Sequence, residues 1–126
     1  MAEKEGIILY AEDTPVVREG GVNMLRAYFP TFELETFEDG TSLEERLNQD
    51  LSGVKIVVLD DDMPEISGSE IIRRYATREE FEGIPFILHY GGDKSIGERA
   101  LENGARAYVL KPDSFYGEVR RALVIL

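Results

Sequence analysis

Acidic side chains follow two apolar segments of this 126-residue chain, and a lysine follows a third. The segments with their polar neighbours are 7–11 with Glu12-Asp13, 54–59 with Asp60-Asp61-Asp62, and 106–110 with Lys111. Carboxylates are ligands that suit Mg2+, which is commonly held by one or two of them together with a phosphate. A lysine can pair with a phosphoryl oxygen, and an aspartate beside a metal can act as a nucleophile and form an acyl phosphate. These residue types therefore indicate phosphoryl chemistry assisted by a divalent cation.

The elements that must position these residues alternate along the chain. Strands are predicted at 7–11, 32–37, 54–59, 84–90 and 106–110, and helices at 15–28, 41–49, 67–77, 95–103 and from 113 onward. Five strand-then-helix repeats predict a parallel sheet with helices on both faces, because parallel neighbours need crossover connections. Ligands of such sheets bind outside the carboxyl ends of the strands, so we expect the acids and the lysine to meet there.

Patterns within these segments refine the prediction. Glu33 and Glu35 alternate with apolar neighbours, which indicates an edge strand, whereas the continuous apolar run 56–59 indicates a central one. Helix starts are predicted from residues with capping chemistry. These are Thr14 before Pro15, Thr41 with Glu44, Ser67 with Glu70, Ser95 with Glu98, and Asp113. Gly20 and Gly21 each cost ~1 kcal/mol within the first helix, which either close packing on the sheet or plain local weakness would explain.

Composition excludes several classes of protein. The length fits one domain spanning 1–126, and the absence of cysteine excludes disulfides and thiolate metal sites. With 25 acidic against 14 basic residues the net charge is −11, which disfavours direct contact with nucleic acid. The first residues lack the order of a signal peptide, and no apolar run approaches the ~20 residues that cross a bilayer. We therefore expect a soluble, cytoplasmic protein with no membrane partner.

These residues together resemble the response-regulator receiver family, which includes the stand-alone chemotaxis regulators. The resemblance covers roughly residues 6–126. It is carried by Glu12-Asp13, by Val58-Leu59-Asp60-Asp61-Asp62-Met63-Pro64 with Gly68 after it, and by Lys111-Pro112. It implies a flavodoxin-like (βα)5 fold, with a five-stranded parallel sheet in the order 2-1-3-4-5. It also implies Mg2+-dependent transfer of a phosphoryl group from the phosphohistidine of a histidine kinase or phosphotransfer protein.

The resemblance assigns a role to each matching residue. Asp60 matches the phosphoacceptor, because in the family that residue lies three positions before the Met-Pro pair. The metal ligands that it implies are Asp13, Asp60, the backbone carbonyl of Asp62, and Glu12, which usually reaches the metal through water. Lys111 matches the lysine that pairs with the phosphoryl group, and its bond to Pro112 is cis in the family.

One position departs from the family. The alignment of 85–89 places Tyr90 where the family has a Ser or Thr whose hydroxyl bonds the phosphoryl group. A tyrosine hydroxyl can donate, but it lies farther from the backbone, so we do not expect the same short contact. Tyr108 matches the switch aromatic, which in the family moves inward as the Ser or Thr moves. Since Tyr90 would occupy that space, we expect a domain that is phosphorylated but has an atypical switch.

Other functions stay open. Asp60-x-Asp62 mimics the acid pair of haloacid-dehalogenase-like phosphatases, although Pro64 stands where that motif has Thr or Val. A pseudo-receiver, acting only as a protein-interaction module, would be compatible with Tyr90. His89 is the sole histidine, and its place in an apolar strand favours a packed ring over a phosphoryl relay.

The resemblance also implies partners. Upstream it implies a histidine kinase or phosphotransfer protein, and downstream another protein or a fused output domain. The surface made by residues 95–126 is the face that family members often use, and a homodimer could form through it. No enzymatic turnover is expected beyond self-catalysed phosphorylation and dephosphorylation.

Overall fold

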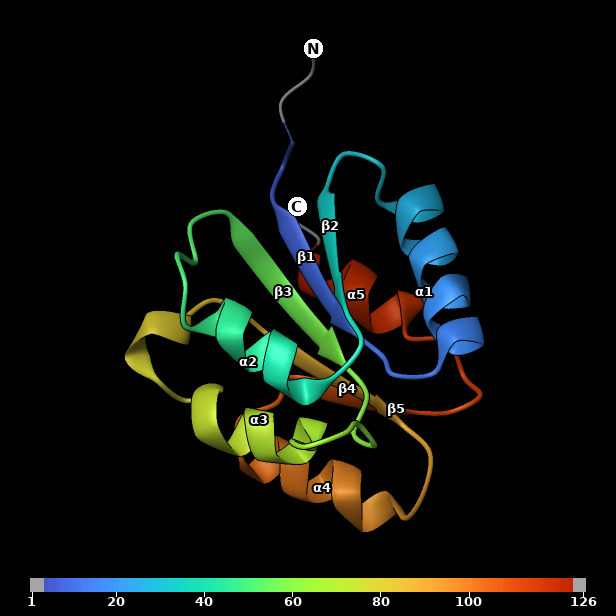
Figure 1. The fold of residues 1–126 in the computed structure, drawn as a ribbon, viewed down its shortest axis with the longest axis vertical. Coiled ribbons are helices and arrows are strands. Elements are labelled where there is room, and N and C mark those ends of the chain that lie inside the picture. The colour runs from blue at the N-terminus through green and yellow to red at the C-terminus, as the bar shows by residue number, and fades with distance from the viewer. Residues whose placement is uncertain (1–3, 124–126) are drawn as a thin grey trace.

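The computed structural model describes residues 4–123, in which five strands alternate with five α-helices (Figure 1). The strands are β1 (Ile7–Ala11), β2 (Glu33–Phe37), β3 (Val54–Leu59), β4 (Phe86–Tyr90) and β5 (Ala107–Leu110). The helices are α1 (Pro15–Tyr28), α2 (Gly40–Leu47), α3 (Gly68–Tyr75), α4 (Lys94–Glu102) and α5 (Tyr116–Leu123), with the 3-10 helix η1 (Glu79–Phe81) before β4. The alternation predicted from the apolar segments is therefore confirmed. The predicted face 95–126 extends beyond the described residues at its last three positions.

The five strands form one parallel sheet in the order β2-β1-β3-β4-β5, which confirms the predicted topology. Strand β2 lies at an edge, as its alternating glutamates indicated, and the fully buried run Ile56–Leu59 of β3 lies at the centre. Ala11 of β1 is in register with Leu59 of β3, and Tyr90 of β4 is in register with Leu110 of β5. The residues that follow these strands consequently emerge at one edge of the sheet.

Helices cover both faces of the sheet. In Figure 1, α2, α3 and α4 lie on one side and α1 and α5 on the other. Along β1, Leu9 and Ala11 belong to the core under the first group, whereas Ile8 and Tyr10 belong to the core under the second. A strand that buries both of its faces needs apolar residues at successive positions, which explains the continuous apolar runs in the sequence.

Helix starts agree with the sequence only in part. Ser67 caps α3 as predicted, because its hydroxyl accepts the amide of Glu70 at 3.1 Å. The caps predicted at Thr41 and Ser95 are wrong, since a carboxylate two residues earlier caps each helix. The capping residues are Asp39 for α2, which accepts the amide of Ser42, and Asp93 for α4, which accepts the amide of Ser95. A carboxylate at this position also interacts favourably with the positive end of the helix dipole.

The first helix begins at Pro15 as predicted, whereas the last begins three residues later than predicted. Thr14 precedes α1, with Pro15 at its start, but the threonine side chain makes no capping hydrogen bond. Helix α5 begins at Tyr116 rather than at Asp113, and the hydroxyl of Ser114 accepts the amide of Tyr116 at 3.1 Å. The start of α5 is displaced because the chain first completes a turn after β5, in which the amide of Asp113 donates to the carbonyl of Leu110 at 2.9 Å.

The two glycines within α1 have different surroundings. A Cβ atom on Gly21 would lie 2.2 Å from the hydroxyl oxygen of Tyr10, whereas one on Gly20 would meet nothing within 4 Å. Close packing on the sheet therefore accounts for Gly21, while nothing in the packing requires glycine at position 20.

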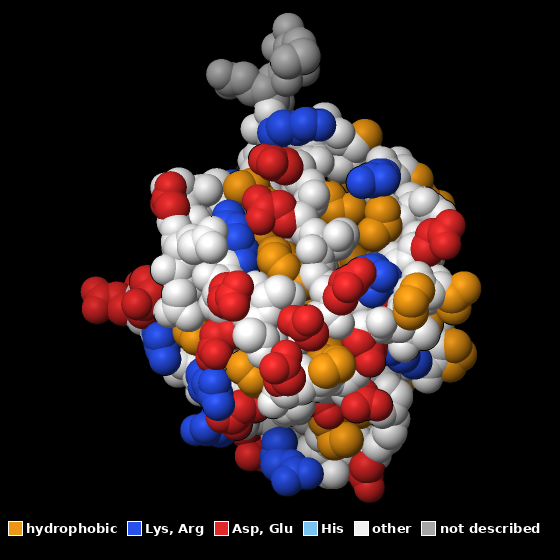
Figure 2. All heavy atoms as spheres, viewed as in Figure 1, with side chains coloured by type: hydrophobic (Ala, Val, Ile, Leu, Met, Phe, Trp, Pro, Cys, Tyr) orange, Lys and Arg blue, Asp and Glu red, His pale blue; other side chains and the backbone are white. Residues whose placement is uncertain are grey.

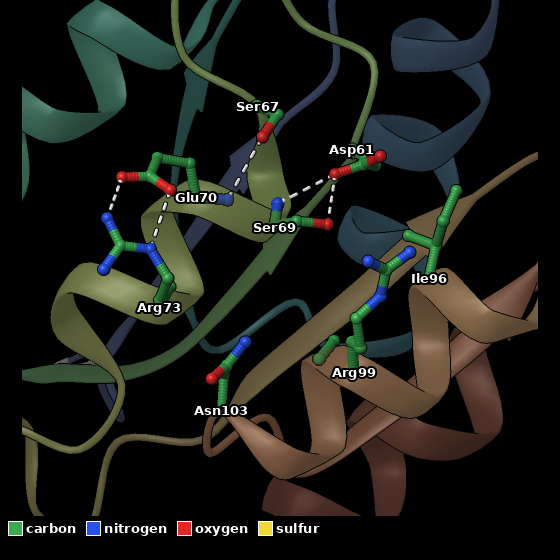
Figure 3. Close-up of a pocket in the computed structure, with 9 residues that line it drawn as sticks. Asp61, Ser67, Ser69, Glu70, Arg73, Ile96, Arg99 and Asn103 are labelled. Carbon is green, nitrogen blue, oxygen red and sulfur yellow. Dashed lines mark hydrogen bonds and ion pairs between the residues drawn. The ribbon is translucent and has the colours of Figure 1, made fainter.

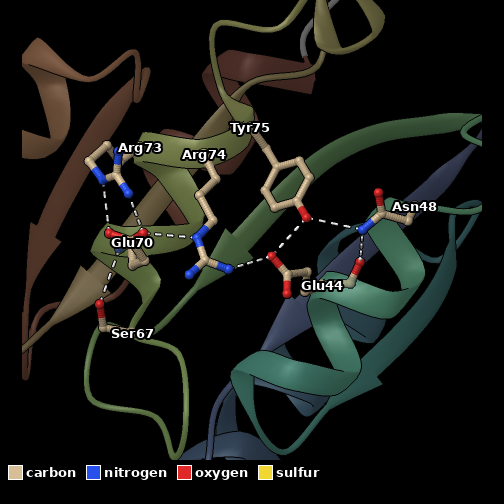
Figure 4. Close-up of polar contacts among 7 residues, drawn as sticks. All are labelled: Glu44, Asn48, Ser67, Glu70, Arg73, Arg74 and Tyr75. Carbon is tan, nitrogen blue, oxygen red and sulfur yellow. Dashed lines mark hydrogen bonds and ion pairs between the residues drawn. The ribbon is translucent and has the colours of Figure 1, made fainter.

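Polar contacts join α2 to α3 (Figure 4). The hydroxyl of Tyr75 donates to Glu44 at 2.7 Å and accepts from Asn48 at 3.0 Å. Arg74 forms ion pairs at 2.8 Å with both Glu44 and Glu70. The hydrogen bond from Tyr75 and the guanidinium of Arg74 lower the pKa of Glu44. These contacts fix α3, the helix that directly follows the loop after Asp60.

Acidic side chains are spread over the face seen in Figure 2, with basic side chains between them, as the net charge of −11 leads one to expect. None of the helices within residues 4–123 has both the length and the apolar character that crossing a membrane requires. The peptide bond between Lys111 and Pro112 is cis, as the resemblance implied.

Candidate functional site

Three of the strand ends bring the predicted residues into one cluster. Glu12, Asp13 and Asp60 each offer a carboxylate oxygen, and the three oxygens lie within 4.8 Å of one another. The Nζ atom of Lys111 lies 3.1 Å from Oδ1 of Asp60 and 2.9 Å from Oε1 of Glu12. The structure thus assembles four residues that are up to 99 positions apart in the sequence, from Glu12 to Lys111.

Backbone hydrogen bonds that continue the strand ladders hold these residues in place. The amide of Glu12 donates to Phe37 at 3.0 Å, and the amide of Asp60 donates to Ala11 at 2.9 Å. The amide of Lys111 donates to the carbonyl of Tyr90 at 2.7 Å. Glu12, Asp60 and Lys111 therefore follow their strands directly and take their positions from the sheet, and Asp13 is the neighbour of Glu12.

Two residues support the site in ways that the sequence analysis missed. Arg18 reaches back from α1, and its guanidinium donates to the carbonyl of Glu12 at 2.8 Å. Gly68 allows α3 to approach the site, because a Cβ atom there would lie 2.1 Å from the carbonyl oxygen of Asp60. The only sequence signals for them were the position of Arg18 one turn into the helix after Glu12 and Gly68 in the family motif.

Burial and charge make the cluster electrostatically crowded. The exposed fraction is 0% for Glu12 and 3% for Asp60. Burial and the neighbouring Glu12 carboxylate raise the pKa of Asp60 to about 7, against a partial opposing effect of Lys111. Burial alone would lower the pKa of Lys111, but its contacts with Glu12 and Asp60 raise it. A cation close to the carboxylates would relieve this crowding.

The donor set fits a hard divalent cation. Oε2 of Glu12 accepts the amide of Thr14 at 3.2 Å. Oε1 is buried, and its one near neighbour of opposite charge within residues 4–123 is the ammonium of Lys111 at 2.9 Å. The buried carboxylate of Glu12, together with those of Asp13 and Asp60, makes an all-oxygen set of the kind that Mg2+ prefers. The side chain of Asp62 is exposed and outside this set, so its backbone carbonyl as a ligand stays a prediction.

Tyr90 is fully buried, and its hydroxyl points to α4. The hydroxyl accepts the amide of Gly97 at 3.1 Å and donates to the carbonyl of Lys94 at 3.3 Å. Tyr108 lies beside it, with ring centroids 6.1 Å apart, and a Cβ atom on Gly97 would lie 2.3 Å from the Tyr108 ring. The tyrosine hydroxyl is therefore bonded to the first turns of α4.

Asp61 lies outside the cluster of acidic side chains. Its carboxylate accepts the amide of Ser69 at 2.8 Å and the hydroxyl of the same residue at 2.5 Å. It lies in a groove of about 330 Å3 between α3 and α4, which Arg73 and Arg99 also line (Figure 3). This geometry agrees with the assignment of Asp60, rather than Asp61, to the acidic cluster.

His89 packs as the sequence predicted. Its exposed fraction is 7%, and its ring lies edge-on to Phe115 with centroids 4.9 Å apart. Nε2 of the ring lies 2.8 Å from the carbonyl oxygen of Asp113. The ring is therefore buried and held by the backbone, as expected of a packed histidine rather than a phosphoryl relay.

Comparison with known sequences identifies the class of protein that this fold and cluster define. The sequence model of the response regulator receiver domain matches residues 8–116. The chain belongs to this family, whose members act in two-component signalling and have an acidic pocket that binds Mg2+.

Similar proteins are regulators and a kinase. The chain is 39% identical over 84 residues to the phosphate regulon transcriptional regulatory protein PhoB of Rhizobium meliloti, covering 66% of this chain and 36% of that protein. It is 28% identical over 123 residues to hybrid signal transduction histidine kinase D of Dictyostelium discoideum, covering 95% of this chain and 8% of that protein. The chain therefore spans well under two thirds of the length of these relatives.

Solved structures agree in fold. The BeF3-activated DrrB receiver domain has a TM-score of 0.77 at 24% identity, covering 94% of this chain and 97% of that one. The signal receiver domain of a DNA-binding response regulator from Colwellia psychrerythraea has a TM-score of 0.80 at 20% identity, covering 92% and 94%. The described sheet order and helix arrangement are therefore those of receiver domains.

Proposed function

We propose that this chain accepts one phosphoryl group on Asp60 from the phosphohistidine of a histidine kinase or phosphotransfer protein. The observation that carries the proposal is the contact of 3.1 Å between Lys111 Nζ and the Asp60 carboxylate, beside Glu12 and Asp13. A receiver of this kind acts once per phosphoryl group and does not turn over a substrate as an enzyme does.

The reaction forms one bond and breaks one. An oxygen of the Asp60 carboxylate attacks phosphorus, the N–P bond of the donor phosphohistidine breaks, and the imidazole leaves with the bonding electrons. Asp60 must be ionised to attack, and Lys111 favours the ionised form because its ammonium lies beside the carboxylate. In the product, Nζ of Lys111 would pair with a phosphoryl oxygen. Its positive charge would offset negative charge on the transferred phosphoryl group.

Glu12, Asp13 and Asp60 are the residues that would hold Mg2+, with the carbonyl of Asp62 as the predicted further ligand. When bound, the ion would neutralise charge on the transferring phosphoryl group. Arg18 keeps the Glu12 backbone in place, and so would contribute by positioning rather than by contact with the phosphoryl group.

Phosphoryl uptake tests the proposal directly. We expect the wild-type chain, incubated with acetyl phosphate and Mg2+, to gain the mass of one phosphoryl group. We expect Asp60→Asn to gain none, and the matched variant Asp61→Asn to behave as wild type, because an asparagine side chain there could still accept the hydrogen bonds from Ser69. Equal uptake by Asp60→Asn would refute the site. Failure of the wild-type chain to take up phosphate would favour the pseudo-receiver.

We also propose an atypical output step. Tyr90 bonds the α4 backbone through Gly97 and Lys94, so its hydroxyl is engaged away from Asp60. Phosphorylation would have to move α4 without a serine or threonine hydroxyl at this position. The altered surface would contact a downstream protein or a fused output domain, and a homodimer through 95–126 remains a prediction. The proposed location is the cytoplasm, where ATP charges histidine kinases.

A further inference from the structure

The turn that carries Lys111 is only partly anchored by the backbone. Residues 112–114 are exposed and lie between β5 and α5. The amide of Lys111 donates to the carbonyl of Tyr90 at 2.7 Å, and the amide of Asp113 donates to the carbonyl of Leu110 at 2.9 Å. Both bonds tie the turn back to the ends of the strands, and neither fixes its far side, where the chain turns toward α5.

His89 of β4 supplies an anchor at that far side. Its Nε2 atom lies 2.8 Å from the carbonyl oxygen of Asp113. A carbonyl oxygen can only accept a hydrogen bond, so Nε2 carries the hydrogen and donates it. Within residues 4–123, His89 is the one side chain whose hydrogen bond joins the backbone of residues 111–114 to another element of the fold. Strand β4 therefore holds the turn through a side chain as well as through the carbonyl of Tyr90.

The imidazole ring is itself firmly placed. Its exposed fraction is 7%, and it lies edge-on to the buried ring of Phe115, with centroids 4.9 Å apart. Burial lowers the pKa of His89, so the ring stays neutral and adds no second positive charge beside Lys111. An apolar side chain could fill this place without the cost of burying a polar ring. The hydrogen bond to the turn is what a histidine adds to the packing.

The anchored carbonyl lies two residues after Lys111. Nζ of Lys111 reaches Oδ1 of Asp60 at 3.1 Å. A lysine side chain is long and flexible, so its ammonium keeps such a contact best where the backbone below it is fixed. Misplacement of a positioned group by about 1 Å can slow a reaction about 100-fold. The hydrogen bond from His89 therefore bears on the phosphoryl site from a distance.

We propose that His89 is a positioning residue for phosphoryl transfer. It fixes the turn after β5 through the carbonyl of Asp113, and so keeps the ammonium of Lys111 beside Asp60. This role rests on the function proposed above for Asp60 and Lys111. It involves no contact between His89 and the phosphoryl group, and no transfer of a proton.

Two substitutions separate the hydrogen bond from the packing. His89→Leu keeps an apolar side chain in the core and removes the donor, whereas His89→Gln keeps an N–H donor that can reach the place of Nε2. With acetyl phosphate and saturating Mg2+, we expect His89→Leu to slow phosphoryl uptake about 10-fold, because the backbone bond of Lys111 to Tyr90 remains. We expect His89→Gln to restore a rate close to that of the wild type.

A double-mutant cycle tests whether His89 acts through the lysine. In a Lys111→Met background, His89→Leu should cause no further slowing, because the group that it positions is already gone. His89→Leu should also leave the Mg2+ dissociation constant, measured from the amide shifts of Asp13, no weaker than in the wild type. A general distortion of the fold would weaken Mg2+ binding together with uptake.

The ammonium resonance of Lys111 provides a measurement without any phosphodonor. In metal-free protein, this 15N-coupled signal, assigned by its loss in Lys111→Met, should report the ion pair in the wild type and in His89→Gln. In His89→Leu it should move to the position of a free lysine. An unchanged signal in His89→Leu, equal losses of rate in the Leu and Gln variants, or further slowing in the Lys111→Met background would overturn the proposal. A wild-type chain that takes up no phosphoryl group would refute the proposed function instead, and the ammonium signal would still decide whether His89 positions Lys111.

Discussion

Replacing Asp60 by asparagine should stabilise the metal-free chain above neutral pH. The folded state raises the pKa of Asp60 from 3.8 to about 7 through burial and the Glu12 carboxylate, while the unfolded chain keeps an ordinary value. Between about pH 4 and pH 7 the folded state thus binds a proton that the unfolded state has lost. The stability that this proton supplies is complete below pH 4 and is lost as the pH rises through 7.

The size of the effect follows from the same pKa values. A difference of about 3 between folded and unfolded pKa corresponds to an upper limit of ~4 kcal/mol at pH 8. Relaxation of the site and entry of water reduce such penalties, so we expect ~1–3 kcal/mol. Asparagine carries no charge and avoids this cost, and Lys111 would still face Glu12 in the variant.

Urea unfolding from pH 5 to pH 8.5, in the presence of EDTA, measures the difference. Asp60→Asn should exceed the wild type in free energy of unfolding at pH 8, and the gap should shrink toward pH 5. Asp61→Asn, which also removes one carboxylate, serves as the control for net charge and should open no comparable gap. Mg2+ added at ten times its dissociation constant should raise the free energy of unfolding of the wild type by ~1.4 kcal/mol, and that of Asp60→Asn by less. A gap that is independent of pH, or a variant less stable than the wild type at pH 8, would refute the reasoning.

Three further outcomes are expected. In urea unfolding, Gly20→Ala should raise the free energy of unfolding by ~0.5–1 kcal/mol. Gly21→Ala should lower it, because its Cβ would lie 2.2 Å from the hydroxyl oxygen of Tyr10. Equal effects of the two substitutions would contradict this packing. Tyr90→Phe should cost ~1–3 kcal/mol and speed amide exchange in α4, because the Gly97 amide loses its acceptor; unchanged exchange would argue against that bond. The pKa of His89, measured by NMR titration, should fall below 6.5 because the ring is buried. This group then adds stability as the pH rises toward 6.5. A pKa above 6.5 would show that the effect of burial is not the largest one on this ring.

The sheet and the acidic cluster could be predicted from the sequence because both follow from periodicity. Apolar runs of strand length fix which segments are buried, and parallel crossovers place every strand end at one edge. Glu12, Asp60 and Lys111 each follow a strand directly and Asp13 comes one residue later, so their meeting needed no knowledge of side-chain packing.

Features that depend on contacts between distant elements could not be predicted from the sequence. The sequence predicted Thr41 as the start of α2, whereas in the folded turn the carboxylate of Asp39 caps the helix. The position of Arg18 one turn after Glu12 does not by itself distinguish an arginine that bonds the Glu12 carbonyl from one that faces solvent. The direction of the Tyr90 hydroxyl depends on how closely α4 approaches β4, which a single sequence does not encode in any local pattern.

The side chains that would carry out phosphoryl transfer are separate from the tyrosine hydroxyl that contacts α4. The side chains that would bind and transfer the group follow β1, β3 and β5, and β4 contributes to them only the Tyr90 carbonyl that holds Lys111. The side chain of Tyr90 instead bonds Gly97 in α4. A substitution that removes the hydroxyl should thus leave uptake by Asp60 intact while changing the response of α4. If both changed together, the two functions would share a connection that these contacts do not contain.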